Sequence, residues 1–266
     1  MKFKRISHIA TKVADSFSSN LAPLIRKQIH VSQERREEIE NVTAYTYFLH
    51  ARHLLHNENE SSVKQALEFF DKAIEEDPSF ARAYVGRAEC YLSLSDYALL
   101  GFVEGAKKAE AEVKKALELD RDLAEAHAIL SHVRYALDDF SQAEEEAKKA
   151  VELNPSHADA YHALGHLAMI REKIAEGTRL FETAYKLDPL KEGNVEMLGQ
   201  VYLYAGREEE ALKLWSRTEH LFPQASYGGM IEYYLIKQDY SKANEMLEKF
   251  GLSPGSTLSK LLVLRV

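Results

Sequence analysis

The chain has 266 residues, 45% of them hydrophobic, with 34 basic and 42 acidic side chains and a formal net charge of -8. This length and hydrophobic content can bury a substantial core, and the mild acidic excess without a basic stripe argues against a dedicated nucleic-acid surface. The single cysteine, Cys90, excludes an internal disulfide framework and suits a reducing compartment, so we expect a cytoplasmic protein in which Cys90 is a small buried hydrophobe.

Residues 1–40 are expected to form an N-terminal amphipathic helical segment. Its first 33 residues are basic and carry Asp15 as their one acid. Charged and polar residues interrupt the apolar ones, so neither a secretion signal nor a membrane span of ~20 residues is predicted. The apolar face of this segment should pack against the helices that follow and cap them. The alternatives are that it mediates self-association, binds an anionic membrane surface or targets the chain to an organelle. Its apolar residues are Phe3, Ile6, Ile9, Ala10, Val13 and Phe17, continued beyond Pro23 by Leu21, Leu24, Ile25 and Ile29.

A repeat with a step of 34 residues follows. In each copy a small residue is followed four positions later by a residue that is bulkier in most copies, and then by a third recurring position. Each copy ends at a helix-breaking position. The three sets are Ala109, Ala143, Gly177 and Ala211; Val113, Ala147, Phe181 and Trp215; and Ala116, Ala150, Ala184 and Thr218. The breaks are Arg121, Pro155, Pro189 and Pro223, and a looser first copy reads Ala66, Phe70, Ala73 and Pro78.

This period resembles a tetratricopeptide array, in which each repeat is a pair of antiparallel helices. The resemblance implies an all-α, right-handed superhelical solenoid of about six helix pairs across 41–250. The expected repeats are 41–80, 81–123, 124–157, 158–191, 192–225 and a weaker sixth at 226–250. Residues 251–266 should supply a C-terminal capping helix after a glycine stop at Gly251, or else an interaction stub.

The second repeat is longer than the others. Nine extra residues between Tyr91 and Ala109 include an apolar run at 97–103. An apolar insertion needs a surface to cover it, so it is expected to pack on the first repeat, with a contact site as the alternative.

The first repeats also resemble those found behind a cyclase or winged-helix domain in prokaryotic multidomain regulators. The resemblance lies in the stretch 41–55, in 66–70 and in 77–84, and it covers residues 1 to about 155. Because Met1 stands where the effector domain would have ended, cyclase activity and DNA binding are not carried over. The resemblance implies only the sensing or docking half of such a regulator.

In such solenoids the first helices of successive pairs line a concave groove that holds extended or helical peptides. Family resemblance places positions two, five and nine of each first helix on this groove. Those positions are Tyr45, Phe48 and Arg52; Arg82, Val85 and Glu89; Glu125, Ala128 and His132; Asp159, His162 and His166; and Gly193, Glu196 and Gln200. One end of the groove is therefore aromatic and basic, and its middle is acidic and rich in histidine.

Besides peptide binding, the groove residues leave three alternatives open: a solvated groove of mixed polarity with no single ligand, a pH-sensing groove and a metal site. The basic clamp of chaperone-docking relatives is missing, since Phe48, Arg52, Ile129 and Glu125 occupy the matching positions. His162 and His166, four residues apart on one helix face, could sense pH. With His132, Asp159 and Glu196 they could instead approach a metal, although no metal site or cofactor is expected.

We expect a non-catalytic protein–protein interaction scaffold or adaptor that binds a peptide segment of another protein. The alternative is a sensory or regulatory module that responds to a small ligand, a metal or pH in a signalling or transcriptional system. The sequence Gly251-Leu252-Ser253-Pro254-Gly255 has the letters of a nucleophile elbow but follows a helix and contains proline. No enzymatic activity is expected.

Overall fold

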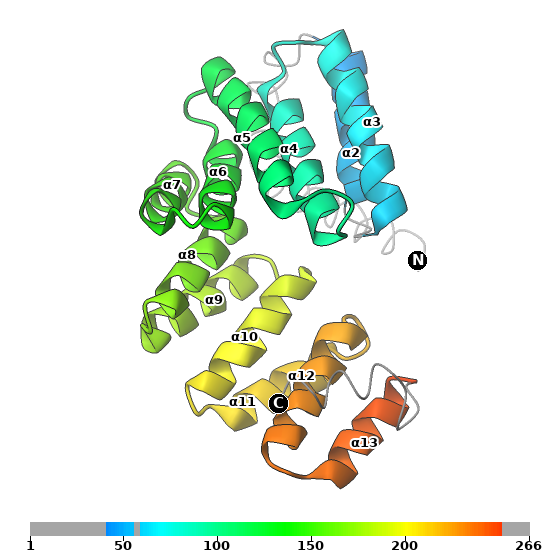
Figure 1. The fold of residues 1–266 in the computed structure, drawn as a ribbon, viewed down its shortest axis with the longest axis vertical. Helices are drawn as coiled ribbons and strands as arrows, with labels where there is room; N and C mark the ends of the chain where they lie inside the picture. Colours follow the sequence, from blue (N-terminus) through cyan, green and yellow to red (C-terminus); the bar gives the residue numbers. More distant parts are fainter. Residues whose placement is uncertain (1–40, 56–58, 252–266) are drawn as a thin grey trace, which may run out of the picture.

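The computed structural model describes residues 41–55 and 59–251, which form twelve α-helices and contain no strand (Figure 1). The N-terminal segment 1–40 and, beyond Gly251, the expected C-terminal cap lie outside the described residues. The helices are α2 Val42–Leu55, α3 Glu60–Glu76, α4 Ala81–Asp96, α5 Phe102–Leu119, α6 Ala124–Ala136, α7 Phe140–Leu153, α8 Ala158–Ile170, α9 Ile174–Leu187, α10 Glu192–Tyr204, α11 Glu208–Thr218, α12 Pro223–Ile236 and α13 Tyr240–Lys249.

The helices pack as consecutive antiparallel pairs that curve into an arc. Figure 1 shows α2–α5 and α10–α13 at the two ends of this arc, with α6–α9 between them. The first helices of neighbouring pairs also touch, as α2 does with α4, α4 with α6, α6 with α8 and α10 with α12. The all-α superhelical solenoid expected from the repeat is therefore confirmed. None of the described helices combines the length and apolar content needed to cross a membrane.

The residues that define the repeat are the buried ones. All of the second-helix positions in the three recurring sets are buried, because each faces the first helix of its own pair and that of the next. The core is thus a continuous strip between neighbouring helices, as expected for a solenoid. Three larger apolar clusters lie along it, centred on the first repeat, the second and third, and the fifth and sixth.

Several close approaches pair a glycine on a first helix with an aromatic ring on a second helix. Trp215 of α11 is 0% exposed and lies between Gly199 of α10 and Gly229 of α12. A Cβ atom added at either glycine would lie 2.3 Å from the indole. Gly86 stands in the same relation to the Phe70 ring, where the distance would be 2.2 Å. These glycines leave room for rings that fill the space between neighbouring pairs.

The turns within the last four pairs share one backbone conformation. Asp138, Glu172, Gly206 and Gln238 all have φ between 57° and 72°, in the left-handed region. Each follows a first helix and lets the chain reverse into the second. Gly251 has φ 80° at the end of α13, where the sequence predicted a glycine stop.

The insertion of the second repeat is only partly covered. Leu100 is half-buried and packs against the cluster formed by the first repeat. Tyr97, Leu99, Phe102 and Val103 are 38%, 40%, 56% and 52% exposed in the described part of the chain. Packing on the first repeat therefore accounts for one of these apolar side chains and leaves four on the surface.

Gly229→Ala should destabilise the protein by about 1–3 kcal/mol, because the new methyl group would force the indole of Trp215 or the axis of α12 to move. The adjacent Gly228 has no atom within 4 Å of an added Cβ. Gly228→Ala is therefore a matched control in the same helix, and it should be neutral or stabilise by up to about 1 kcal/mol through helix propensity.

Urea unfolding followed by circular dichroism measures both variants. Equal midpoints for the two alanine variants would show that the close packing around Trp215 does not limit stability. A smaller penalty for Gly229→Ala in a Trp215→Phe background would attribute the cost directly to the indole.

Candidate binding groove

The groove residues expected from the sequence lie on the first helices α2, α4, α6, α8 and α10. They differ in burial, in ion pairing and in hydrogen bonding. At the α2 end, Tyr45 stacks on Phe48 with ring centroids 6.1 Å apart. Phe48 is 8% exposed and packs against Phe70 and Phe80, with centroids 5.9 and 5.0 Å away. The Phe48 ring therefore belongs to the core beneath the groove, and Tyr45 covers it.

Most of the charged groove residues pair with one another across repeats. Arg52 of α2 forms an ion pair with Glu89 of α4. Arg82 of α4 donates to Glu125 of α6 at 2.8 Å. These ion pairs are partly exposed, so each contributes no more than about 1 kcal/mol to stability, but they leave the first half of the groove electrically balanced.

The same arrangement recurs in the fourth repeat, where Asp159 of α8 accepts from Lys191, the residue before α10, at 2.6 Å. The Lys191 ammonium group outweighs burial and lowers the pKa of Asp159 to about 2. Burial opposes ionisation of Glu125 as well, but its backbone hydrogen bond and Arg82 lower the pKa of that carboxyl group. Burial raises the pKa of Glu89 despite Arg52.

His162 and His166 form a hydrogen-bonded chain that ends on a buried amide. The Nε2 atoms of the two rings are 3.0 Å apart, and His162 Nδ1 lies 2.8 Å from Asn194 Oδ1. Asn194 of α10 is 0% exposed, and its Nδ2 donates to the carbonyl oxygens of Asp188 and Ala184. The Phe181 ring packs edge-on against both imidazoles, with a centroid-to-centroid distance of 5.2 Å to each.

The buried amide fixes the direction of every hydrogen bond in this chain. Because both donors of Asn194 point at carbonyl oxygens, its Oδ1 accepts, and His162 Nδ1 must carry the proton. The His162 Nε2 of a neutral ring then accepts from Nε2–H of His166. Burial lowers the pKa of His162 to about 4, and burial together with His162 lowers the pKa of His166 to about 4.

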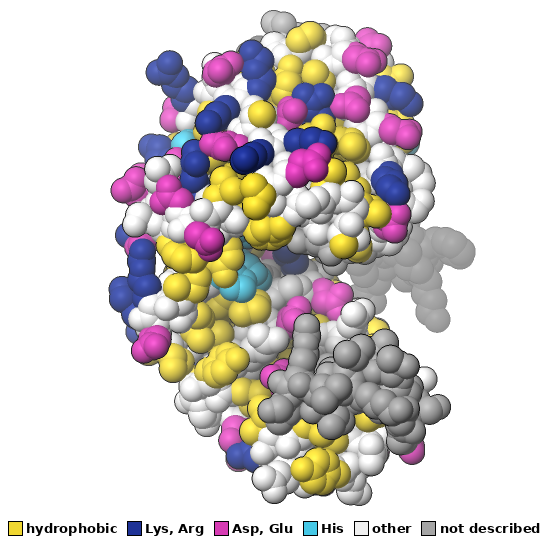
Figure 2. Space-filling model, viewed as in Figure 1, with side chains coloured by type: hydrophobic (Ala, Val, Ile, Leu, Met, Phe, Trp, Pro, Cys, Tyr) yellow, Lys and Arg dark blue, Asp and Glu magenta, His cyan; other side chains and the backbone are white. Residues whose placement is uncertain are grey.

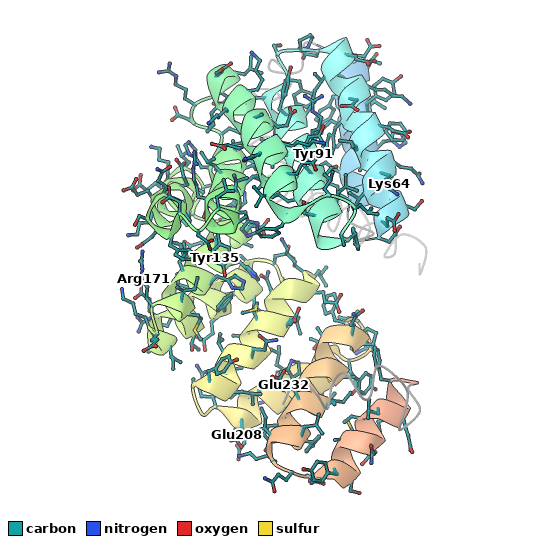
Figure 3. All side chains as sticks on the ribbon, in the orientation of Figure 1. Lys64, Tyr91, Tyr135, Arg171, Glu208 and Glu232 are labelled. Carbon is teal, nitrogen blue, oxygen red and sulfur yellow. The ribbon has the colours of Figure 1, made fainter. Side chains whose placement is uncertain are left out.

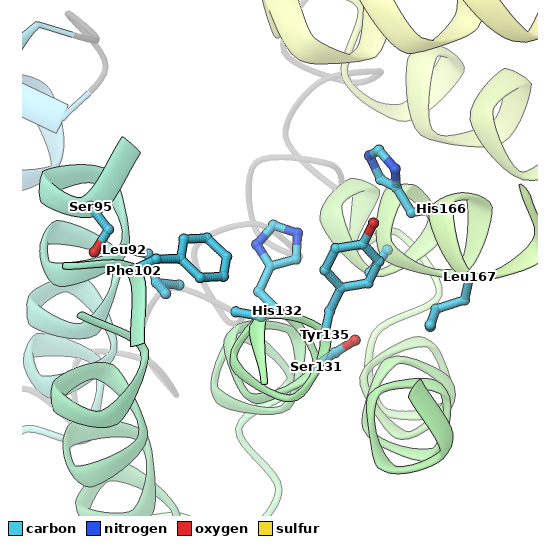
Figure 4. A pocket seen from close by; sticks show the side chains of 10 residues that line it. Leu92, Ser95, Phe102, Ser131, His132, Tyr135, His166 and Leu167 are labelled. Atoms are coloured by element: carbon cyan, nitrogen blue, oxygen red, sulfur yellow. The ribbon is translucent and has the colours of Figure 1, made fainter. Parts of the chain in front are cut away.

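A pocket of about 230 Å³ opens beside His166, between α4–α5, α6 and α8. Figure 4 shows His132, Tyr135 and His166 along it, with Phe102 of the insertion on the opposite side. The Tyr135 ring centroid lies 6.0 Å from that of His166. His132 is exposed and lines this pocket together with His166.

A second, larger hollow of about 820 Å³ lies over α10 and α12. Glu196 and Gln200 line it, together with Gly193 and Gly228, whose backbone no side chain approaches closely. Glu232, labelled on α12 in Figure 3, also lines this hollow. The remaining lining residues are Tyr97, Lys191, Glu192, Trp215, Gln224, Ala225, Gly229 and Leu235.

The groove therefore changes character between its ends. Figure 2 shows a group of histidine side chains at the notch of the arc, with hydrophobic side chains around it and acidic side chains below it. Among the described residues no group of three or more His, Cys, Asp or Glu side chains is placed to hold a metal ion. His132, Asp159 and Glu196 thus do not join His162 and His166 in a site with three or more ligands.

Sequence reasoning missed Asn194, which orders the histidine chain. A signal for it existed, since the equivalent buried positions in α4, α6, α8 and α12 hold Ala83, Ala126, Ala160 and Ser226. A large polar amide where most repeats have alanine implies a specific hydrogen-bonding role. Tyr97 was noted only as part of the insertion, although it reaches the hollow over α10 and α12.

Stacked helix pairs with bare glycines at the contacts and a polar inner groove define an α-helical repeat protein of the solenoid class. A family model described as tetratricopeptide repeat matches residues 59–99 and 130–192. The chain accordingly contains tetratricopeptide repeats in these two stretches, and its fold is that of tetratricopeptide-repeat proteins.

Solved structures agree on the fold. The chain is similar to Pseudomonas aeruginosa pilF, with 20% identity, a TM-score of 0.57, and coverage of 84% of this chain and 98% of that one. It is also similar to a thermophilic tetratricopeptide-repeat protein of Thermus thermophilus, with 19% identity, a TM-score of 0.56, and coverage of 68% and 92%. At these identities the likeness concerns the fold alone.

Among curated proteins the chain is similar to the transcriptional regulator HilA of Salmonella typhimurium, with 24% identity over 127 residues. The match covers 48% of this chain and 23% of HilA, so the chain matches about a quarter of the length of that relative.

The histidine chain predicts a pH dependence of stability. The folded-state pKa values of about 4 lie below the ordinary value of ~6.5. The unfolded chain therefore binds more protons between those values, so stability is full above pH ~6.5 and falls as the pH decreases toward 4. Between pH 7.5 and pH 5 each histidine should cost about 2 kcal/mol, because pH 5 lies about 1.5 units below ~6.5 and each unit corresponds to 1.36 kcal/mol, so the pair should cost about 4 kcal/mol.

Urea unfolding at the two pH values measures this loss, and NMR titration of the imidazole Cε1–H signals locates the proton uptake. A His162→Gln/His166→Gln variant should lose part of the difference between the two pH values. Titration midpoints near ~6.5 for both rings would contradict the prediction.

Proposed function

We propose that the protein is a non-catalytic interaction scaffold whose inner groove binds a segment of a partner protein, with the hollow over α10 and α12 as the main contact. The observation that carries this proposal is the hollow itself, about 820 Å³ on the inner face. It is the larger of the two inner-face hollows described above, and it adjoins the bare backbone at Gly193 and Gly228.

The charges along the groove favour this end as the contact. In the first half, Arg52 and Arg82 already neutralise acidic partners on the next helix. A ligand there would have to displace these ion pairs. The hollow over α10 and α12 is lined by Glu192, Glu196 and Glu232, and Lys191 is its one lining cation among the described residues. Glu192 accepts a hydrogen bond from the backbone N–H of Ala225, and Lys191 pairs with Asp159.

The chemistry of the hollow indicates the kind of partner segment. An acidic surface attracts Lys and Arg side chains and speeds their encounter at low salt. Bare glycine backbone permits close approach of a peptide main chain. We therefore expect a basic extended or helical segment, with an apolar residue directed toward Leu235 and Tyr97 at the edge of the hollow.

Charge reversal in the hollow tests this function. Glu232→Lys changes an exposed carboxylate in the hollow, and Glu145→Lys on α7 makes the same charge change at an exposed position that does not line it. Proteins should be retained from native lysate by the wild type and by Glu145→Lys. About tenfold less of them should be retained by Glu232→Lys, with the difference shrinking as salt is raised.

Retained proteins are identified by mass spectrometry, and their binding segments by peptide array. Enrichment of Lys and Arg in the bound peptides would support the proposal. Capture of the same proteins in the same amounts by all three forms, or no capture by any, would show that the hollow is not the working surface.

A second candidate is a regulatory module in a transcriptional system, which the likeness to HilA favours. In this reading a small ligand or a proton changes the curvature of the superhelix. X-ray scattering profiles across pH 5.5 to 8 provide the test. Superimposable profiles would count against proton sensing by the groove histidines.

A further inference from the structure

We propose that His162 and His166 form a two-histidine chelate for a divalent transition-metal ion, with Cu²⁺ the preferred ion. This inference concerns α8 and α10 and does not rest on the scaffold function. The two imidazoles lie four residues apart on one face of α8, so their rings project in the same direction.

The distance between the donor atoms suits chelation of one ion. The two Nε2 atoms are 3.0 Å apart. With metal–nitrogen bonds of about 2.05 Å, this separation gives an angle at the metal of roughly 95°. A tetrahedral angle of ~109° would need a separation of about 3.3 Å with the same bond length. A small rotation of either ring reaches both separations, so the pair can hold one ion in either geometry, and Cu²⁺ is preferred because nitrogen ligands bind it most strongly in this series of divalent ions.

Asn194 orients the first ligand. Histidine ligands in metal sites usually donate their other ring N–H to a neighbouring acceptor, which fixes the tautomer and leaves the second nitrogen for the metal. Asn194 Oδ1 accepts from His162 Nδ1 at 2.8 Å and is itself held by two backbone carbonyl oxygens. Nε2 of His162 is therefore a lone-pair donor directed toward His166.

Metal binding moves one proton within the histidine pair and releases none to solvent. In the metal-free pair one proton lies between the two Nε2 atoms, on His166. A metal ion would take its place, and His166 would carry that proton on Nδ1 instead, an atom for which no hydrogen bond within the described residues is found. Both rings are neutral at pH 7, since burial lowers their pKa to about 4.

The surroundings leave room for further ligands. Phe181 meets both rings edge-on at 5.2 Å and restricts their rotation. The pocket of about 230 Å³ beside His166 has space for water or for a donor group of a bound molecule. Asp159, the acid of the same helix turn, is engaged by Lys191 at 2.6 Å and is not counted as a ligand.

Titration of the full chain with Cu²⁺, Ni²⁺ and Zn²⁺ tests the proposal. The wild type should bind one more Cu²⁺ ion per chain with high affinity than His162→Gln or His166→Gln does. The wild-type site should bind Cu²⁺ more tightly than Ni²⁺ and more tightly than Zn²⁺. Electron paramagnetic resonance of the Cu²⁺ form should show two equatorial nitrogens in the wild type and one or none in each variant.

His50→Gln is the matched control, because His50 is an exposed histidine stacked on Phe69 at 5.5 Å, outside the pair. It should bind as the wild type does. Asn194→Ala should weaken Cu²⁺ binding about 10–100-fold while keeping both nitrogens in the spectrum. If His162→Gln fails to fold, as judged by circular dichroism, His166→Gln decides the question.

Equal Cu²⁺ stoichiometry and affinity in the wild type and in both pair variants would overturn the proposal, because binding would then be adventitious at other histidines of the chain. A wild-type spectrum with a single equatorial nitrogen would overturn it as well.

Discussion

The close packing of aromatic rings against glycine between successive helix pairs is the constraint on which the rest of the structure depends. Trp215 fills the space between α10 and α12 because Gly199 and Gly229 have no side chains there. Phe70 and Gly86 do the same between α3 and α4. Since cores pack at the density of organic crystals, these contacts fix the spacing of neighbouring pairs. Spacing in turn sets the curvature of the arc and the width of the groove.

Curvature decides which groove side chains meet. The step from one first helix to the next brings Arg52 to Glu89, Arg82 to Glu125, and Asp159 to Lys191. These pairs tie adjacent repeats together and remove free charge from the first half of the groove. The hollow over α10 and α12 keeps an excess of acidic groups. A ligand that recognises charge is therefore favoured at one end of the molecule.

The histidine chain shows how a single buried polar group can order a surface. Asn194 is completely buried, and its Nδ2 donates both hydrogens to backbone carbonyl oxygens. Its Oδ1 therefore accepts from His162, which fixes the tautomer of His162 and, through it, that of His166. Removing the amide would leave buried partners unsatisfied, which typically costs about 1–3 kcal/mol for each group. The same amide that stabilises the junction of α8 and α10 thus also orients the imidazoles at the groove.

The 34-residue period by itself determined the helix pairs, the all-α solenoid and the buried faces, because residues spaced by a helical period share a face wherever the helix lies. It also predicted that His162 and His166 would project together. Only the tertiary structure decided that Phe48 is buried in the core and that charged groove residues form ion pairs across repeats. It also decided that Asn194 of the next repeat hydrogen-bonds His162. These contacts join residues about 32 to 43 positions apart, and their distances depend on the angle between successive pairs. Packing around the glycines sets that angle, and no local pattern encodes it.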